Sequence, residues 1–239
     1  MTKLLVSVRD VEEALLAADA GADFIDLKEP GAGALGGLPV ATIAAVVAAL
    51  RQRGSTLPLS ATIGDLPALP LGPGLADVLA KVHAVATCGV DYVKVGIERS
   101  AHAGPLLRAL AGSGCPVVPV FIADRGLHSR SVQLACSLGF PALMVDTTDK
   151  RAGSLFDVME VAALRAFVQA VRAAGAMAGL AGALRLPDLP VLCELGSDFA
   201  GFRSAVCDGD RAGTLDAQRL RALALALRRA GVQRPIQPA

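Results

Sequence analysis

The stretch DAGADFIDLK, residues 19–28, shows how the whole chain is organised. It joins the end of an expected helix to a short apolar run through Gly21, which suits the left-handed backbone that ends many helices. The same junction returns at four further glycines: Gly89, Gly139, Gly175 and Gly196. Apolar runs that alternate with helical stretches in this way predict βα units and a parallel sheet covered by helices.

Eight such units account for the chain. The runs expected to form strands are residues 4–8, 23–28, 57–63, 91–97, 116–123, 142–147, 177–182 and 199–203. The Ala- and Leu-rich stretches expected to form helices are 10–20, 40–53, 74–88, 100–112, 128–138, 158–174, 187–195 and 214–230. This count predicts an α/β fold, a single (β/α)8 TIM barrel over residues 1–231, with a frayed tail at 232–239. A doubly wound open sheet is the alternative, but VSVRDVEEA (6–14) lacks its glycine fingerprint.

Composition excludes several functions. The formal net charge is +1, so a large basic surface for nucleic acid or an anionic membrane is not expected. Five cysteines show no Cys-x-x-Cys spacing and do not cluster with the three histidines, which argues against disulfides and a metal site. The first apolar run is too short for a secretion signal or a membrane span, and we expect a cytoplasmic protein.

Polar residues gather where the expected strands end. In a TIM barrel the working residues come from these ends and from the loops that follow. The candidates are Ser7, Asp26, Lys28, Ser60, Thr62, Lys94, Asp124 and Asp146. Alternation places Asp26 and Lys28 on one face of their strand. Apolar surroundings favour the neutral amine of a lysine, the form that attacks carbonyl groups, and imine chemistry also needs groups that move protons.

A structural reading of the same charges stays open. Asp26 and Lys28 would then form a buried ion pair that fixes strand register, and Lys94 would pair with Asp124 or Asp146. We favour the functional reading because charges at these strand ends face the pocket of a barrel.

Glycine-rich turns indicate phosphate binding. AGLAGALR (178–185) and AGFRSAVC (200–207) follow the last two strands, where barrels often hold a phosphate. Gly182, Ser204 and the guanidinium of Arg203 are the candidate ligands. The alternative is that these glycines only permit close packing. Two further loops are candidates for the site. EPGAGALGG (29–37) would close over a ligand or donate N–H groups to an anion, the alternative being an ordinary loop. DKRAGSLFD (149–157) is expected to be a flexible loop that carries Lys150 toward the site.

Seven stretches in order resemble one known family. They are LLVSVRDVEEA, GADFIDLKEPGAGALGG, SATIGDLP, DYVKVGI, MVDTTDKRAGSLFD, LAGAL and GFRSAVC, between about Lys3 and about Arg229. Together they resemble the (5-formylfuran-3-yl)methyl phosphate synthases, TIM barrels that make the furan precursor of methanofuran. The resemblance implies a carbon–oxygen lyase that condenses two molecules of glyceraldehyde 3-phosphate with loss of phosphate and water.

The resemblance also implies roles for individual residues. Lys28 matches the lysine that forms the Schiff base and Lys94 the lysine that transfers protons. Asp26 would assist Lys28, and Lys150 matches a lysine of the loop after the sixth strand. We expect Asp124 to help move protons. No cofactor or metal is expected, because the imine supplies the electrophile.

Other activities are compatible with the same residues. One alternative is another Schiff-base aldolase or a phosphosugar isomerase. A second is a non-catalytic barrel that binds a phosphorylated ligand. In each case the expected partner is a small phosphorylated molecule, with no nucleic acid and no membrane, and we expect the protein to form a homo-oligomer.

Overall fold

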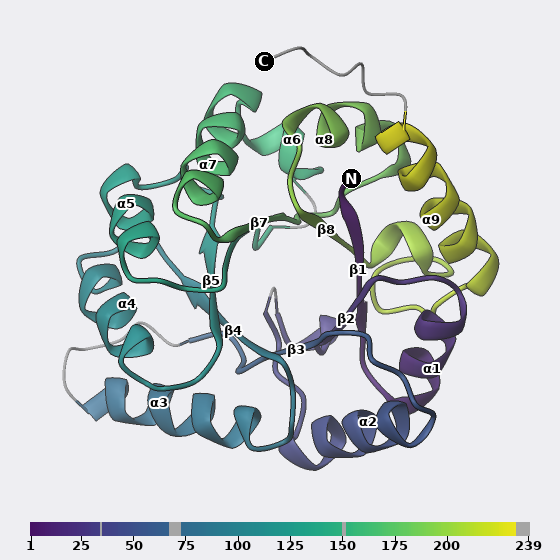
Figure 1. Cartoon of the computed structure of the whole chain (residues 1–239), viewed down its shortest axis with the longest axis horizontal. Coiled ribbons are helices and arrows are strands. Elements are labelled where there is room, and N and C mark those ends of the chain that lie inside the picture. The colour runs from purple at the N-terminus through teal and green to yellow at the C-terminus, as the bar shows by residue number, and fades with distance from the viewer. Residues whose placement is uncertain (34, 67–72, 150–151, 233–239) are drawn as a thin grey trace.

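Eight parallel strands close into a barrel in the computed structural model of the chain (Figure 1). The strands are β1 (Lys3–Val8), β2 (Phe24–Leu27), β3 (Leu59–Thr62), β4 (Tyr92–Ile97), β5 (Val117–Ile122), β6 (Ala142–Asp146), β7 (Met177–Leu180) and β8 (Phe199–Phe202). Each strand pairs with the next, and β1 also pairs with β8. This closure confirms the predicted barrel and excludes the open sheet. The structure describes residues 1–33, 35–66, 73–149 and 152–232.

Helices surround the barrel (Figure 1). They are α1 (Val11–Asp19), α2 (Val40–Gln52), α3 (Pro73–Ala86), α4 (Ala103–Ala111), α5 (Ser129–Ser137), α6 (Leu155–Val158), α7 (Val161–Ala173), α8 (Leu189–Leu195) and α9 (Ala217–Val232). Every stretch expected to be helical overlaps one of them, with ends that differ by a few residues. Within the described ranges, no helix combines the length and apolar character needed to cross a membrane. The tail beyond residue 232, which we expected to fray, lies outside the described residues.

Part of the loop that follows β6 is helical, which differs from the flexible loop expected at 149–157. The single turn of α6 begins after Ser154, whose side chain accepts a hydrogen bond from the backbone of Phe156. In return, the carboxylate of Asp157 accepts the N–H of Ser154 at 2.8 Å. This reciprocal cap stabilises a helix of only four residues, which is too short to show a helical period in the sequence.

The five glycines at the helix–strand junctions have the left-handed backbone that the sequence predicted. Their φ angles run from 69° to 96° at Gly21, Gly89, Gly139, Gly175 and Gly196. At Gly196 the N–H donates to the carbonyl of Leu192 at 3.3 Å and ends α8. A side chain at such a position would strain the backbone, so glycine turns the chain into the next strand.

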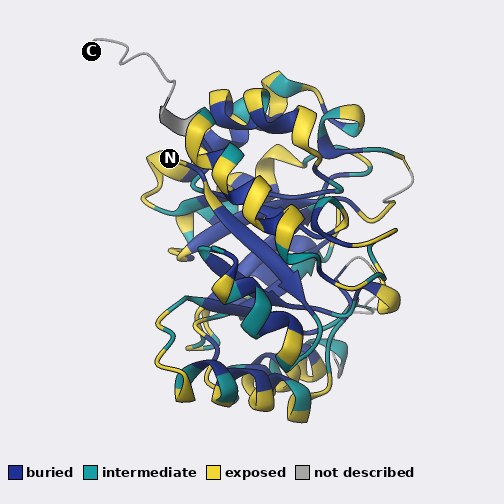
Figure 2. Cartoon of the chain, turned by 90° about the vertical axis from the view of Figure 1, so that its right-hand side faces the viewer, coloured by how far each residue is buried: buried dark blue, intermediate teal, exposed yellow. Residues whose placement is uncertain are grey.

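Alternation along the strands separates two apolar regions. In β4, Val93, Val95 and Ile97 face outward and belong to the large cluster between the barrel and its helices. A smaller cluster fills the barrel itself, with Phe24 and Phe199 in ring contact near its amino-terminal end. Figure 2 shows the strands as a buried centre within the helices. Apolar side chains therefore line most of the barrel interior below the carboxyl ends of the strands, and polar side chains lie above them.

Candidate active site

Asp26 is the centre of a buried polar cluster inside the barrel. Strand register places Ser7 of β1 and Ser60 of β3 on either side of Asp26 in β2. Ser60 Oγ donates to Asp26 Oδ1 at 2.6 Å, and Ser7 Oγ donates to Oδ2 at 3.3 Å. Asp26 is 1% exposed, so these hydroxyl groups replace the water that its carboxylate loses on burial.

Lys94 of β4 completes this cluster. Its Nζ lies 2.9 Å from Asp26 Oδ2, and both side chains are almost fully buried. Apolar rings lie below Lys94 in the barrel, among them Phe24, Tyr92 and Phe199. A buried ion pair is tolerated when further hydrogen bonds satisfy its atoms, and the two serine hydroxyls supply them here.

Lys28 directly follows β2 and pairs with Asp146 at the end of β6. Its Nζ lies 3.4 Å from Asp146 Oδ2, and both side chains are buried. Within the part of the chain that the structure describes, this is the single polar contact of the Lys28 amine. Lys28 is therefore held more loosely than Lys94.

The structure corrects the partners that we expected from the sequence. Asp26 was expected to assist Lys28, and pairing of Lys94 with Asp124 or Asp146 was the structural alternative. Instead Asp26 holds Lys94, and Asp146 holds Lys28. Side chains two residues apart on one strand stand roughly parallel, about 6–7 Å apart. Inward side chains of different strands converge on the barrel axis, so a partner from another strand is closer.

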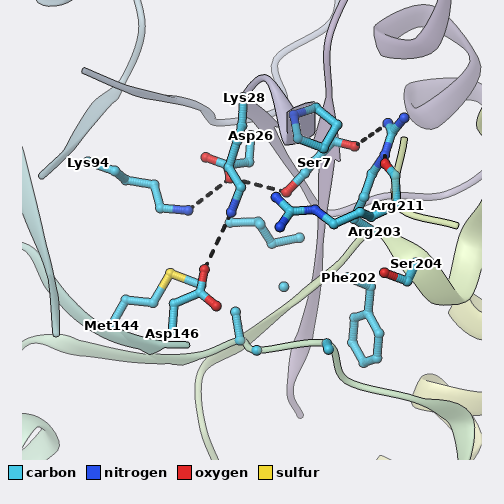
Figure 3. Close-up of a pocket in the computed structure, with 16 residues that line it drawn as sticks. Ser7, Asp26, Lys28, Lys94, Met144, Asp146, Phe202, Arg203, Ser204 and Arg211 are labelled. Carbon is cyan, nitrogen blue, oxygen red and sulfur yellow. Dashed lines mark hydrogen bonds and ion pairs between the residues drawn. The ribbon is translucent and has the colours of Figure 1, made fainter. Parts of the chain in front are cut away.

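A pocket of about 490 Å³, partly open to solvent, lies over these two ion pairs (Figure 3). The expected site residues that line it are Ser7, Asp26, Lys28, Lys94, Asp146, Gly182, Arg203 and Ser204. Figure 3 shows Arg203, Ser204 and Arg211 on the side of the pocket opposite Lys94.

The loop at 29–37 places a leucine inside the barrel. Leu35 is 2% exposed and belongs to the interior apolar cluster. It occupies space left by Gly96, because a Cβ on Gly96 would come within 2.8 Å of Leu35 Cδ1. Gly96 is one inward position beyond Lys94 on β4, so Leu35 covers the barrel near that amine. The loop is held by Thr62, whose Oγ1 donates to the carbonyl of Gly36 at 2.9 Å.

Arg203 has partners other than the phosphate that we expected. Its guanidinium makes a two-pronged ion pair with Glu13 of α1, at 2.5 and 3.0 Å. The remaining N–H groups donate to the carbonyls of Ser7, Arg211 and Gly213. Burial by itself lowers the pKa of Arg203, but its bonds to Glu13 outweigh burial and raise it. All five N–H groups are thus engaged, and binding a phosphate would require one of these bonds to break.

Three other predicted site residues do not line the pocket, and a fourth lies outside the residues that the structure describes. Thr62 binds the 29–37 loop, and Ser60 does not line the pocket but donates to Asp26 from deeper in the barrel. Asp124 accepts the backbone N–H groups of Thr148 and Asp149 at 2.7 and 2.8 Å. Partial burial raises the pKa of Asp124, but these bonds outweigh it and leave the pKa below its usual value. Lys150 lies outside the described residues.

The sequence reasoning missed three residues of this region. Glu13 lies in the first turn of a helix, where acidic residues are common because they interact favourably with the helix dipole, so it did not stand out as a site residue. Leu35 is the single large apolar side chain in EPGAGALGG, which was a usable signal for insertion into the core. Arg211 lies in the polar loop after the 3₁₀ helix Ser204–Val206, and no local pattern marks it.

Comparison with known proteins shows which family the chain belongs to. The sequence profile described as 4-HFC-P synthase matches residues 4–224, nearly the whole chain. The chain belongs to the 4-HFC-P synthase family. This membership confirms the resemblance drawn from the seven stretches above.

Individual relatives agree with the 4-HFC-P synthase assignment. A protein of Methylorubrum extorquens is 39% identical over 230 residues, covering 96% of this chain and 92% of the relative. A (5-formylfuran-3-yl)methyl phosphate synthase of Methanosarcina barkeri is 36% identical over 227 residues, covering 89% of this chain and 94% of the relative. Phosphoribosyl anthranilate isomerase of Thermus thermophilus is 18% identical, covers 95% of this chain and 99% of its own, and has a TM-score of 0.65. This last likeness shows the fold alone.

Proposed function

We propose that this 4-HFC-P synthase family member condenses two molecules of glyceraldehyde 3-phosphate into (5-formylfuran-3-yl)methyl phosphate through an imine on Lys28. The observation that carries the proposal is the pair of buried lysines beside one pocket, each with its own carboxylate. The name of the Methanosarcina barkeri relative supports the product. The proposed enzyme is a carbon–oxygen lyase that acts on phosphates.

Lys28 is the proposed nucleophile. Its amine attacks the aldehyde carbon of one triose phosphate, and the resulting carbinolamine loses water to give the imine. The amine must first give up a proton, and Asp146, at 3.4 Å, is the nearest carboxylate to accept it. Since Lys28 makes one long polar contact among the described residues, little interaction is lost when its Nζ bonds to carbon.

Lys94 is the proposed proton carrier. The imine withdraws electrons, so the neighbouring carbon of the substrate can lose a proton and become an enamine. Lys94 first gives a proton to Asp26, 2.9 Å away, and its amine then accepts the proton from the substrate carbon. Ser7 and Ser60 hold the Asp26 carboxylate in place throughout. The enamine carbon bonds to the aldehyde carbon of the second triose phosphate.

The remaining steps release phosphate and water. Elimination of one phosphate group, attack of a hydroxyl oxygen on a carbonyl carbon and dehydration give the furan ring, and hydrolysis of the imine frees Lys28. In total, two molecules of glyceraldehyde 3-phosphate yield one furan aldehyde phosphate, one inorganic phosphate and two water molecules. Formation of the aromatic ring makes the sequence favourable. Leu35 and the interior rings keep bulk water from Lys94 during proton transfer.

Imine formation is tested by reduction with borohydride in the presence of glyceraldehyde 3-phosphate. We expect a stable mass adduct whose peptide contains Lys28, and no adduct in Lys28→Met. The matched control is Lys81→Met on α3, an exposed lysine far along the chain, which should trap as well as the unmodified protein. Full trapping in Lys28→Met, or an adduct at another lysine only, would refute the role of Lys28.

Product analysis separates the rival activities. The synthase releases inorganic phosphate and forms a furan aldehyde with strong ultraviolet absorption. Another Schiff-base aldolase forms the adduct but retains both phosphates. An isomerase that works by acid and base alone forms neither adduct nor phosphate, and a non-catalytic barrel binds triose phosphate without turnover, with the same affinity in Lys28→Ala.

A further inference from the structure

The cations around the pocket differ in how far their charge is already neutralised. Lys28 pairs with Asp146 and Lys94 with Asp26. Arg203 pairs with Glu13. A phosphate monoester carries a charge of about −1.5 to −2 at neutral pH. A cation that is not already paired with a carboxylate is therefore better able to bind a phosphate group.

Arg211 is such a cation. It lines the pocket, it is half-buried, and it forms no ion pair with any residue that the structure describes. One of its terminal nitrogens donates to the carbonyl of Gly33 at 2.9 Å. The guanidinium has five N–H groups, and this single bond leaves the others available for the oxygens of a ligand. The exposed hydroxyl of Ser204 lines the same side of the pocket.

Arg203 positions the segment that carries Arg211. The Nε of Arg203 donates to the backbone carbonyl of Arg211 at 2.9 Å, and a terminal nitrogen donates to the carbonyl of Gly213 at 2.6 Å. The Glu13 carboxylate fixes the Arg203 guanidinium from α1. Gly213 suits this tight turn, because a Cβ there would lie 1.8 Å from the carbonyl oxygen of Asp208. The Arg211 backbone is thus held in place before any ligand binds.

We propose that Arg211 binds the phosphate group of a triose phosphate substrate, and that Arg203 is a positioning residue for it. This inference rests on the proposed function for the identity of the substrate. We expected Arg203 to contact the phosphate, but all of its N–H groups already donate hydrogen bonds. Arg211 uses one of its N–H groups for Gly33, and the others can donate to a phosphate. The bond to Gly33 also links this contact to the loop that carries Leu35.

The test compares substrates with and without phosphate. Trapping by borohydride is measured against the concentration of glyceraldehyde 3-phosphate and of unphosphorylated glyceraldehyde, in the unmodified protein and in Arg211→Gln. Glutamine retains a donor for the Gly33 carbonyl but has no charge. We expect the half-saturating concentration of glyceraldehyde 3-phosphate to rise about 10- to 100-fold in Arg211→Gln. The value for glyceraldehyde should stay within about twofold, since a charge contact to phosphate is the interaction removed.

A matched control is available in Arg99. This exposed arginine also donates to the carbonyl of another loop, that of Arg125 at 2.9 Å, but it does not line the pocket. Arg99→Gln should leave both half-saturating concentrations unchanged. Arg211→Lys, which retains the charge, should recover part of the affinity for the phosphorylated substrate.

The outcomes distinguish this proposal from the one on which it rests. Equal weakening of both substrates in Arg211→Gln, or no weakening of either, would overturn the role of Arg211 in phosphate binding. If the unmodified protein forms no adduct at all, the proposed function fails, and calorimetric titration with inorganic phosphate then decides the role of Arg211 separately. Inorganic phosphate should bind the unmodified protein more tightly than Arg211→Gln, and equal binding would refute the proposal.

Discussion

The carboxylate of Asp26 lies 2.9 Å from the amine of Lys94, a residue 68 positions away, while Lys28, two positions away, is held by Asp146. The two lysines are therefore separate units with different partners. Lys94 belongs to a tight network with two serine hydroxyls, whereas Lys28 makes one longer contact within the described chain. This asymmetry underlies the assignment of proton transfer to Lys94 and of covalent attack to Lys28.

Removing the charge of Asp26 should destabilise the protein strongly. Asp26→Asn leaves the Lys94 ammonium buried without a counterion, and breaking one side of a buried pair costs about 3–5 kcal/mol. Urea unfolding at pH 7 measures the loss. Asp19→Asn is the control, because Asp19 pairs with Arg53 on the surface and such pairs contribute about 0–1 kcal/mol. Equal losses in the two variants would contradict the account of Asp26.

Replacing Lys94 should separate imine formation from the later chemistry. Lys94→Met lacks the proposed proton carrier but leaves Lys28 and Asp146 in place. We expect the Lys28 adduct still to form with glyceraldehyde 3-phosphate, while furan production falls about 10²- to 10⁴-fold. Mass spectrometry after borohydride treatment and ultraviolet absorbance measure the two quantities. Loss of the adduct together with the product would mean that Lys94 is needed for the first step as well.

Filling the space above Lys94 should displace Leu35. In Gly96→Ala the new Cβ would lie 2.8 Å from Leu35 Cδ1, and such overpacking costs about 1–3 kcal/mol. Because Leu35 covers the barrel near Lys94, product formation should fall as well. Gly104→Ala on α4 is the control, since its Cβ meets Leu134 at an ordinary 3.6 Å and alanine favours a helix over glycine, so stability should not fall and should rise by up to about 1 kcal/mol. A stable, fully active Gly96→Ala would contradict the packing argument.

Asp124 should contribute stability that depends on pH. Its pKa is lowered in the folded protein, so its ionised form favours folding above the unfolded pKa, which is near 3.9. This contribution is lost as the pH falls through the folded pKa. We expect Asp124→Asn to lower the free energy of unfolding by about 1 kcal/mol at pH 7, a modest value because the carboxylate is partly exposed.

Urea unfolding of both proteins from pH 7 down to about pH 3 checks this dependence. The difference between Asp124→Asn and the unmodified protein should be constant near neutrality and should shrink below about pH 4. A difference that grew on acidification would show that the sign of the pKa shift is wrong.

The sequence predicted the barrel well because its signals are local. Glycine at the five helix–strand junctions and alternation along the strands depend on a few neighbouring residues, and both were confirmed in the structure. Alternation also placed Asp26 and Lys28 on the pocket side correctly. These features follow from backbone geometry, which repeats from one unit to the next.

The partners of the charged groups could not be predicted in the same way. Whether Lys28 reaches Asp26 or Asp146 depends on how inward side chains converge across the barrel, which no local pattern records. The pairing of Arg203 with Glu13 joins residues 190 positions apart. The strand ends therefore pointed to side chains that line the pocket, while the pairing of these side chains could be seen only in the three-dimensional structure.

The seam between β1 and β8 has a consequence for the growing chain. All four charges of the two lysine pairs are present once β6 has been synthesised, yet the wall that holds Ser7 against Arg203 forms only when β8 docks on β1. A nascent chain that lacks β8 would carry both lysine amines without the β8 side of the pocket wall. During synthesis, the reactive side chains are therefore made first, and the barrel that surrounds them closes last.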